Sequence, residues 1–198
     1  FDKEGNVTQR GKISVPNLAN RPLGIGVSGL AEVFANLTIA YDSQEAYKVN
    51  KMIFACMYYN CLLESFNISK SNEQKSGWKE NGSYKSFEDN SFEAYIDGKW
   101  SSFIGCPLNN GFFQFDMWKQ EADYLRSIDG LNEKIYNSED DTPVDPSEWG
   151  QHGSWEELRK SILRYGVYNS MFLAPMPTAS SAQMLNNAET TEAHQTLM

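Results

Sequence analysis

The chain has 198 residues, of which 40 % are hydrophobic, and 26 acidic against 17 basic residues give a formal net charge of -9. This length and hydrophobic content allow one sizeable core. The negative charge argues against a general affinity for nucleic acids or anionic membranes, because both require a positive field. An anionic ligand would therefore need a local binding site.

The sequence contains no apolar run of the roughly 18 to 20 residues that cross a bilayer. Residues 1–12 also lack the apolar centre of a signal peptide. We therefore expect a cytoplasmic protein that does not enter the membrane.

The three cysteines, Cys56, Cys61 and Cys106, form neither a CxxC pair nor a cluster with zinc-ligand spacing. We therefore predict neither a disulfide framework nor a metal site. Packed thiols are the favoured interpretation, and a cysteine nucleophile stays open as the alternative.

Two helices are predicted in the first third of the chain. Apolar residues recur at three- and four-residue spacing from Ile25 to Leu37, which indicates the first helix. The second begins after a cap at Asp42 or Ser43, and its apolar stripe continues to Leu63. The stripe is broad, which is typical of a helix buried on several sides.

The rest of the chain alternates between polar and apolar segments. Polar insertions are expected at about 73–105 and 128–150, rich in Ser, Asn, Gly and acidic residues. A short amphipathic helix is predicted from Trp155 to Tyr165, with Gly166 as its stop. The apolar run Ser170–Ala174 then has the length of a buried parallel strand.

Gly24, Gly26 and Gly29 fit the G-x-G-x-x-G pattern that binds a dinucleotide when a strand leads into a glycine turn and a helix. Only Arg21-Pro22-Leu23 precedes the pattern, which is too short for that strand. The favoured interpretation is that the glycines let a helix pack closely on a strand.

The turn from Pro177 to Ser181 is the stronger candidate for ligand binding. It joins the predicted strand to a predicted helix start, where unpaired N–H groups and the helix dipole favour an anion. Thr178, Ser180 and Ser181 add hydroxyl groups, and Ala179 leaves room for a phosphate. Simple N-capping explains the same residues equally well at this point.

Five segments resemble the large subunit of class I ribonucleotide reductases, in the order of that family. The stretch 21–32, RPLGIGVSGLAE, resembles the family's RPIGIGVQGLAD, and 54–65, FACMYYNCLLES, resembles FETIYYGALEAS. The other three are 111–118 (GFFQFDMW), 165–170 (YGVYNS) and 174–183 (APMPTASSAQ). Together the matches extend over nearly the whole chain.

The resemblance implies an α/β fold: residues 1–198 would form part of a ten-stranded α/β barrel, helix-rich with short parallel strands. Such enzymes reduce ribonucleoside diphosphates to deoxyribonucleotides with a cysteine radical. In that family the PTAS loop holds the substrate's diphosphate, so Thr178, Ala179, Ser180 and Ser181 would inherit this role.

The resemblance further implies partners and cofactors outside this chain. They are the remaining part of the large subunit, a second copy of the complete subunit and a small radical-generating subunit with a metal-radical cofactor. ATP and dNTP effectors and a thiol reductant are implied as well. The family's radical cysteine, radical-transfer tyrosines and C-terminal thiols have no counterpart here, and a packing role is expected for Tyr58 and Tyr59.

The chain departs from the family at Tyr168, where an Arg is usual, and at Ala193, where a Pro is usual. Three hypotheses follow. The first is a piece of a reductase large subunit that is inactive alone. The second is a non-catalytic remnant or interaction module derived from the same fold. A nicotinamide-dependent dehydrogenase built on the glycine pattern is a distant third.

Overall fold

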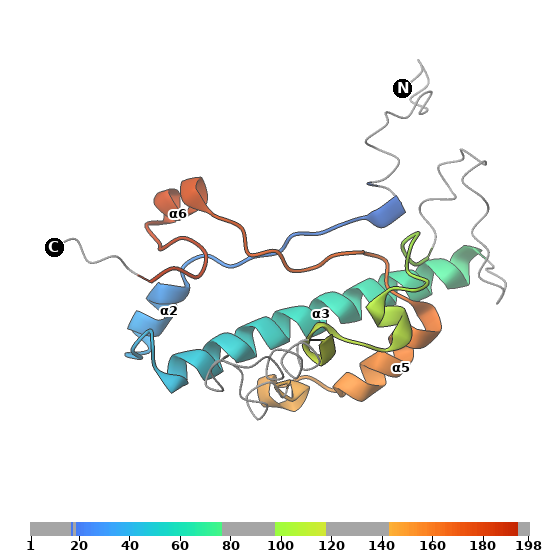
Figure 1. Cartoon of the computed structure of the whole chain (residues 1–198), viewed down its shortest axis with the longest axis horizontal. Coiled ribbons are helices and arrows are strands. Elements are labelled where there is room, and N and C mark those ends of the chain that lie inside the picture. Colours follow the sequence, from blue (N-terminus) through green and yellow to red (C-terminus); the bar gives the residue numbers. More distant parts are fainter. Residues whose placement is uncertain (1–16, 18, 77–97, 118–142, 194–198) are drawn as a thin grey trace, which may run out of the picture. The chain divides into compact units, whose positions relative to one another are not determined.

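The computed structural model of the chain describes residues 17, 19–76, 98–117 and 143–193 (Figure 1). Most of the two predicted polar insertions lies outside these ranges. The described helices are α2 (Leu30–Asn36), α3 (Gln44–Ser76), α5 (Trp155–Tyr165) and α6 (Ala179–Leu185), with short 3-10 helices η2 (Pro107–Asn110) and η3 (Pro146–Trp149). No helix of the described residues is both long and apolar enough to cross a membrane.

The chain divides into two compact units. Unit 1 comprises Phe1–Arg21 and Leu62–Ser170, and unit 2 comprises Pro22–Cys61 and Met171–Met198. Helix α3 contributes its first part to unit 2 and the remainder to unit 1.

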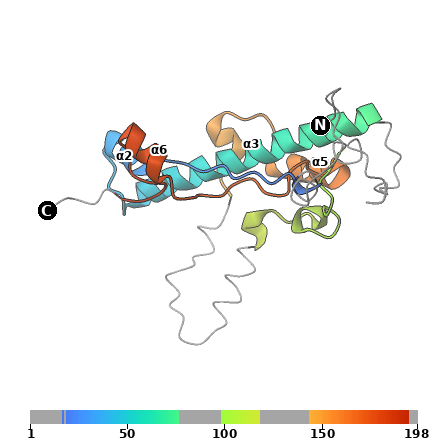
Figure 2. The same cartoon turned by 90° about the horizontal axis from the view of Figure 1, so that it is seen from above.

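Two extended segments of unit 2, residues 22–28 and 171–177, lie side by side (Figures 1 and 2). The Leu23 N–H donates to the Met171 carbonyl at 3.1 Å, and the Ile25 N–H donates to the Phe172 carbonyl at 2.9 Å. The Ala174 N–H donates to the Ile25 carbonyl at 3.0 Å, which completes a parallel bridge between Ile25 and Leu173. Segments nearly 150 residues apart are thus joined by main-chain hydrogen bonds.

This pairing corrects the predicted helix from Ile25 to Leu37. Helix α2 begins only at Leu30, because residues 23–25 bond to the distant segment and the glycines before Leu30 disfavour a helix. The predicted strand Ser170–Ala174 is extended and its partner is parallel, but the pairing amounts to an isolated bridge. Within the described residues no longer strand occurs, so the barrel itself is not observed.

The core of unit 2 lies between α2 and the beginning of α3. Leu30, Phe34 and Ala46 are buried, and the partly buried Ile39, Val49 and Ile53 pack against them. The predicted cap at Ser43 is confirmed, because its hydroxyl oxygen accepts from the Ala46 N–H at 3.1 Å. The apolar stripes of the two predicted helices therefore meet each other.

Helix α3 has 33 residues and continues to Ser76, beyond the predicted stripe. Four of its buried positions, Tyr59, Leu62, Phe66 and Ser69, recur at three- and four-residue spacing. The predicted polar insertion from about residue 73 therefore begins as a continuation of this helix.

Unit 1 is built around α5, whose predicted bounds are confirmed. Ser154 and Glu157 form a reciprocal capping box at its beginning, and Trp155, Leu158 and Ile162 are buried. At its far end the chain stops at Gly166 with φ 69, and a Cβ there would lie 2.8 Å from the Lys99 Cβ. Glycine is therefore required for the close approach as well as for the turn.

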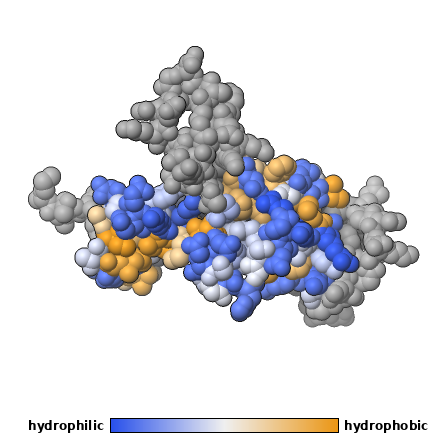
Figure 3. All heavy atoms as spheres, turned by 90° about the horizontal axis from the view of Figure 1, so that it is seen from below, coloured by the Kyte–Doolittle hydropathy of each residue, from blue (hydrophilic) through white to orange (hydrophobic). Residues whose placement is uncertain are grey.

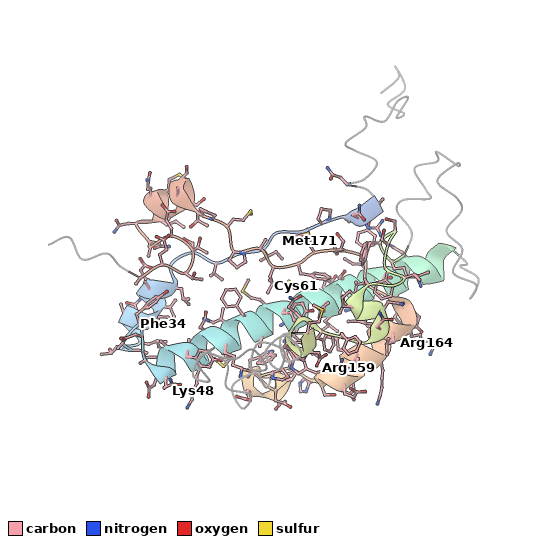
Figure 4. All side chains as sticks on the ribbon, viewed as in Figure 1. Phe34, Lys48, Cys61, Arg159, Arg164 and Met171 are labelled. Atoms are coloured by element: carbon pink, nitrogen blue, oxygen red, sulfur yellow. The ribbon has the colours of Figure 1, made fainter. Side chains whose placement is uncertain are left out.

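Arg159 on α5 contacts residues 111–116 of unit 1 (Figure 4). Its guanidinium contacts the Asp116 carboxylate at 2.8 Å, donates to the Gly111 carbonyl and lies 4.5 Å from the centre of the Phe113 ring. The Asp116 carboxylate also accepts from the Phe113 N–H at 2.8 Å. The GFFQFD segment therefore has a packing role.

A buried polar cluster joins three distant segments of unit 1. The Ser65 hydroxyl donates to Asn169 Oδ1 at 2.9 Å, and its oxygen accepts from the Asn169 N–H at 3.0 Å. Asn169 Nδ2 donates to the Arg21 carbonyl at 2.9 Å. The Arg21 guanidinium lies 3.9 Å over the Tyr168 ring, so the residue that departs from the family at 168 forms a cation–π contact.

Replacing Ser65 by Ala should destabilise the chain by about 1–3 kcal/mol, because both the Asn169 N–H and its Oδ1 would be left buried without Ser65. Urea unfolding of the full chain measures this difference. Ser161→Ala is the matched control, since this exposed hydroxyl bonds only within α5. Equal unfolding free energies for the two variants would contradict the structural role of Ser65.

Two glycines of the 24–29 pattern give a matched pair. A Cβ on Gly26 would lie 3.2 Å from the Ala174 carbonyl oxygen, whereas a Cβ on Gly24 would make an ordinary 3.5 Å contact with the Ala174 Cβ. Gly26→Ala should therefore cost about 1–3 kcal/mol of unfolding free energy. Gly24→Ala should stay within about 1 kcal/mol of the original chain. A larger cost at Gly24 than at Gly26 would contradict the close approach.

Candidate functional site

The candidate site lies in unit 2, where the second extended segment leads into α6. Pro175 and Pro177 restrict the backbone and supply no N–H group, so the chain stays extended up to Thr178. Helix α6 begins at Ala179 with Thr178 as its N-cap, and it ends after seven residues at Asn186, which has φ 55. Of the predicted order of buried strand, hydroxyl-rich turn and helix start, the turn and the helix start are confirmed. The predicted strand is an extended segment with one isolated bridge, and its Met171 is exposed.

Ala179, Ser180 and Ser181 are exposed at the beginning of α6, whereas Ala182 is buried. The N–H groups of a first helical turn have no acceptor within the helix. No acidic residue occupies this turn, so no carboxylate competes there with an anion. The three exposed residues of this turn therefore carry three main-chain N–H groups without an acceptor in the helix and two hydroxyl groups.

Thr178 differs from the three residues that follow it. Its hydroxyl oxygen accepts from the Thr190 N–H at 3.1 Å and lies 3.5 Å from the Ser28 hydroxyl. Its carbonyl accepts from the Ala182 N–H at 2.7 Å. The side chain of Thr178 is thus engaged within the protein, while Ser180 and Ser181 project into solvent.

A returning segment, residues 187–191, packs between this loop and α2. The Thr190 hydroxyl donates to the Met176 carbonyl at 2.5 Å, and the Ala188 N–H donates to Glu32 Oε1 at 2.5 Å. The Ala188 carbonyl accepts from the Gly29 N–H at 3.2 Å. The sequence did not predict these contacts, because no local pattern connects Glu32 with Ala188 or Thr190 with Met176.

The glycine pattern is used for packing. Gly24 and Gly26 lie in the extended pair against Ala174, and Gly29 adopts φ 81 as the N-cap of α2. The N–H of Gly29 is already bonded to Ala188. The close approach that the favoured interpretation predicts is confirmed, but it joins two extended segments and not a helix with a strand.

The cysteines form no disulfide and are half-buried. Burial raises the pKa of the Cys61 thiol, which disfavours its thiolate. Tyr59 is buried in α3, as a packing role predicts. Within the described ranges no group of three His, Cys, Asp or Glu side chains is arranged to hold a metal ion.

Comparison with known proteins identifies the family. A family described as "Ribonucleotide reductase, barrel domain" matches residues 5–198. The ribonucleoside-diphosphate reductase large subunits of Plasmodium falciparum (isolate Dd2) and Caenorhabditis elegans are each 32 % identical over 176 residues, which is 89 % of this chain and 16 % of each relative. The large subunit of Vaccinia virus (strain Copenhagen) is 31 % identical over 179 residues, 90 % of this chain and 16 % of the relative.

The chain thus spans about a sixth of the length of the curated relatives that it matches. The family match, in contrast, extends over almost all of its own residues, including the glycine pattern, α3 and the loop before α6. The chain belongs to the ribonucleotide reductase barrel-domain family.

Proposed function

We propose that the chain is part of the large subunit of a ribonucleoside-diphosphate reductase and supplies the loop that binds the substrate's diphosphate. The substrate would be a ribonucleoside diphosphate, which loses its 2'-hydroxyl as water and becomes the 2'-deoxyribonucleoside diphosphate. The electrons would come from a thiol reductant, and the radical from a small subunit with a metal-radical cofactor. Within this chain we assign no residue to the radical or redox steps.

The observation that carries this proposal is the exposed start of α6 directly after the parallel pair. Extended segments that end beside a helix start present free N–H groups at that edge, which is where anionic ligands bind in α/β folds. Ala179, Ser180 and Ser181 are all exposed there. Together with Thr178, these residues resemble the family's PTAS loop, which holds the substrate's diphosphate.

Each residue would contribute differently to the site. Ser180 and Ser181 would donate from both main chain and hydroxyl, and Ala179 from its main-chain N–H. Thr178 would act mainly by its backbone, because its hydroxyl already contacts Thr190 and Ser28. Charge-assisted hydrogen bonds from these donors would hold a diphosphate although the net charge of the chain is -9.

The chain would work only together with the rest of the barrel. Parallel strands are normally covered on both faces, yet in the extended pair Leu23 is 43 %, Ile25 39 % and Met171 54 % exposed. Figure 3 shows a further apolar patch on the surface of the chain. In unit 2, Val33 of α2 and its C-cap Leu37 are exposed as well. The remaining part of the large subunit is the partner that we expect over the extended pair.

Replacing both loop serines should weaken substrate binding. In the complete enzyme, the Ser180→Ala, Ser181→Ala double variant should raise the KM for a ribonucleoside diphosphate at least about tenfold, because each hydrogen bond to a charged group contributes about 1.5–3 kcal/mol. Steady-state kinetics with the diphosphate measures this change. Ser161→Ala is the control, because this hydroxyl on α5 bonds only to the Glu157 carbonyl. A KM that is unchanged in the double variant would refute the diphosphate site.

The purified chain alone should give no deoxyribonucleotide product, because it has no counterpart of the family's radical and redox cysteines. Turnover assays with a ribonucleoside diphosphate, reductant and small subunit test this, and reductase activity of the isolated chain would contradict it.

Purification from the native source should recover polypeptide that carries the missing cysteines, joined to this chain or bound to it. If no such polypeptide is recovered, the hypothesis of a non-catalytic remnant or interaction module is favoured.

A further inference from the structure

Thr190 contacts the loop before α6 on both sides of Pro177. Its N–H donates to the Thr178 hydroxyl oxygen at 3.1 Å, and its own hydroxyl donates to the Met176 carbonyl at 2.5 Å. One residue thus supplies two donors to a stretch of three residues. All of these atoms belong to unit 2.

The backbone of Thr190 is unusual for its residue type. Its φ of 46 lies in the left-handed region, which β-branched residues rarely adopt. Asn186 also has a positive φ, and asparagine is common in this conformation at the end of a helix. A threonine in the left-handed region is strained, and the surrounding structure must offset the strain. The two donated hydrogen bonds are the compensation that the structure provides.

The loop has few means of fixing its own shape. Pro175 and Pro177 have no N–H to donate, so neither can tie the loop to a neighbouring carbonyl. The segment that carries Thr190 is itself anchored on α2, because Ala188 bonds to Glu32 and Gly29. Thr190 therefore connects the loop to a helix that packs in the core of unit 2.

We propose that Thr190 is a positioning residue, which fixes the direction in which the loop enters α6 and hence the direction of the exposed amides and hydroxyls of residues 179–181. This inference rests on the proposed function, because it deepens the role of the same diphosphate loop. Thr190 itself does not touch the substrate. Its hydroxyl matters because the bond to Met176 holds the proline-containing turn.

The test compares Thr190 variants in the complete large subunit, by steady-state kinetics with a ribonucleoside diphosphate. Thr190→Val keeps the shape but removes the hydroxyl, and it should raise KM about fivefold or more with kcat within about twofold, as expected for one lost hydrogen bond. Thr190→Ser restores the hydroxyl and should return KM to within about twofold of the original. Thr191→Val makes the same chemical change one residue later and should leave KM unchanged.

A second variant keeps the proposal testable if Thr190→Val folds poorly. Thr190→Gly removes the hydroxyl and also relieves the left-handed backbone, so KM should rise while the thermal midpoint does not fall below that of Thr190→Val. A purely structural role would lower the midpoint and the amount of active enzyme with KM unchanged, and that result would overturn the proposal.

The serine double variant separates the two levels of inference. If Ser180→Ala, Ser181→Ala raises KM but the Val and Gly variants of Thr190 do not, positioning by Thr190 is wrong and the diphosphate loop stands. If the serine variant also leaves KM unchanged, the diphosphate loop fails, and the role of Thr190 fails with it.

Discussion

The parallel pairing of residues 23–25 with 171–174 is the constraint on which the rest of unit 2 depends. Three main-chain hydrogen bonds join segments that lie far apart in the chain, so the loop-closure entropy must be offset by the packing around them. The glycines at 24 and 26 make this approach possible, because a side chain at 26 would meet the backbone of the partner segment. Both α2 and α6 start directly after the paired segments.

Helix capping and amphipathic spacing were readable from the sequence. The bounds of α5, the cap at Ser43 and the start of α6 after Thr178 all follow from local rules. The start of α2 did not, because hydrogen bonds to a distant segment outweighed the helical spacing of Ile25 and Val27. The end of α3 was missed as well, since a helix can continue through polar residues such as Asn72 without an apolar stripe.

The candidate loop could be located from the sequence, but its internal connections could not. Thr178, Ser180 and Ser181 looked equivalent as hydroxyl donors, whereas the structure turns Thr178 toward Thr190 and leaves the two serines exposed. Contacts such as Glu32 with Ala188 join residues 156 positions apart, and no local pattern signals them. Which hydroxyl groups of the loop are bonded within the protein and which are free for a ligand therefore depends on tertiary structure.

The most direct measurement is a structure of the complete large subunit with a ribonucleoside diphosphate bound. We expect the phosphate oxygens within hydrogen-bond distance of the main-chain N–H groups of Ala179, Ser180 and Ser181, with the Thr178 hydroxyl still bonded to Thr190. A diphosphate bound elsewhere, with the start of α6 facing only solvent or protein, would contradict the assignment of this loop.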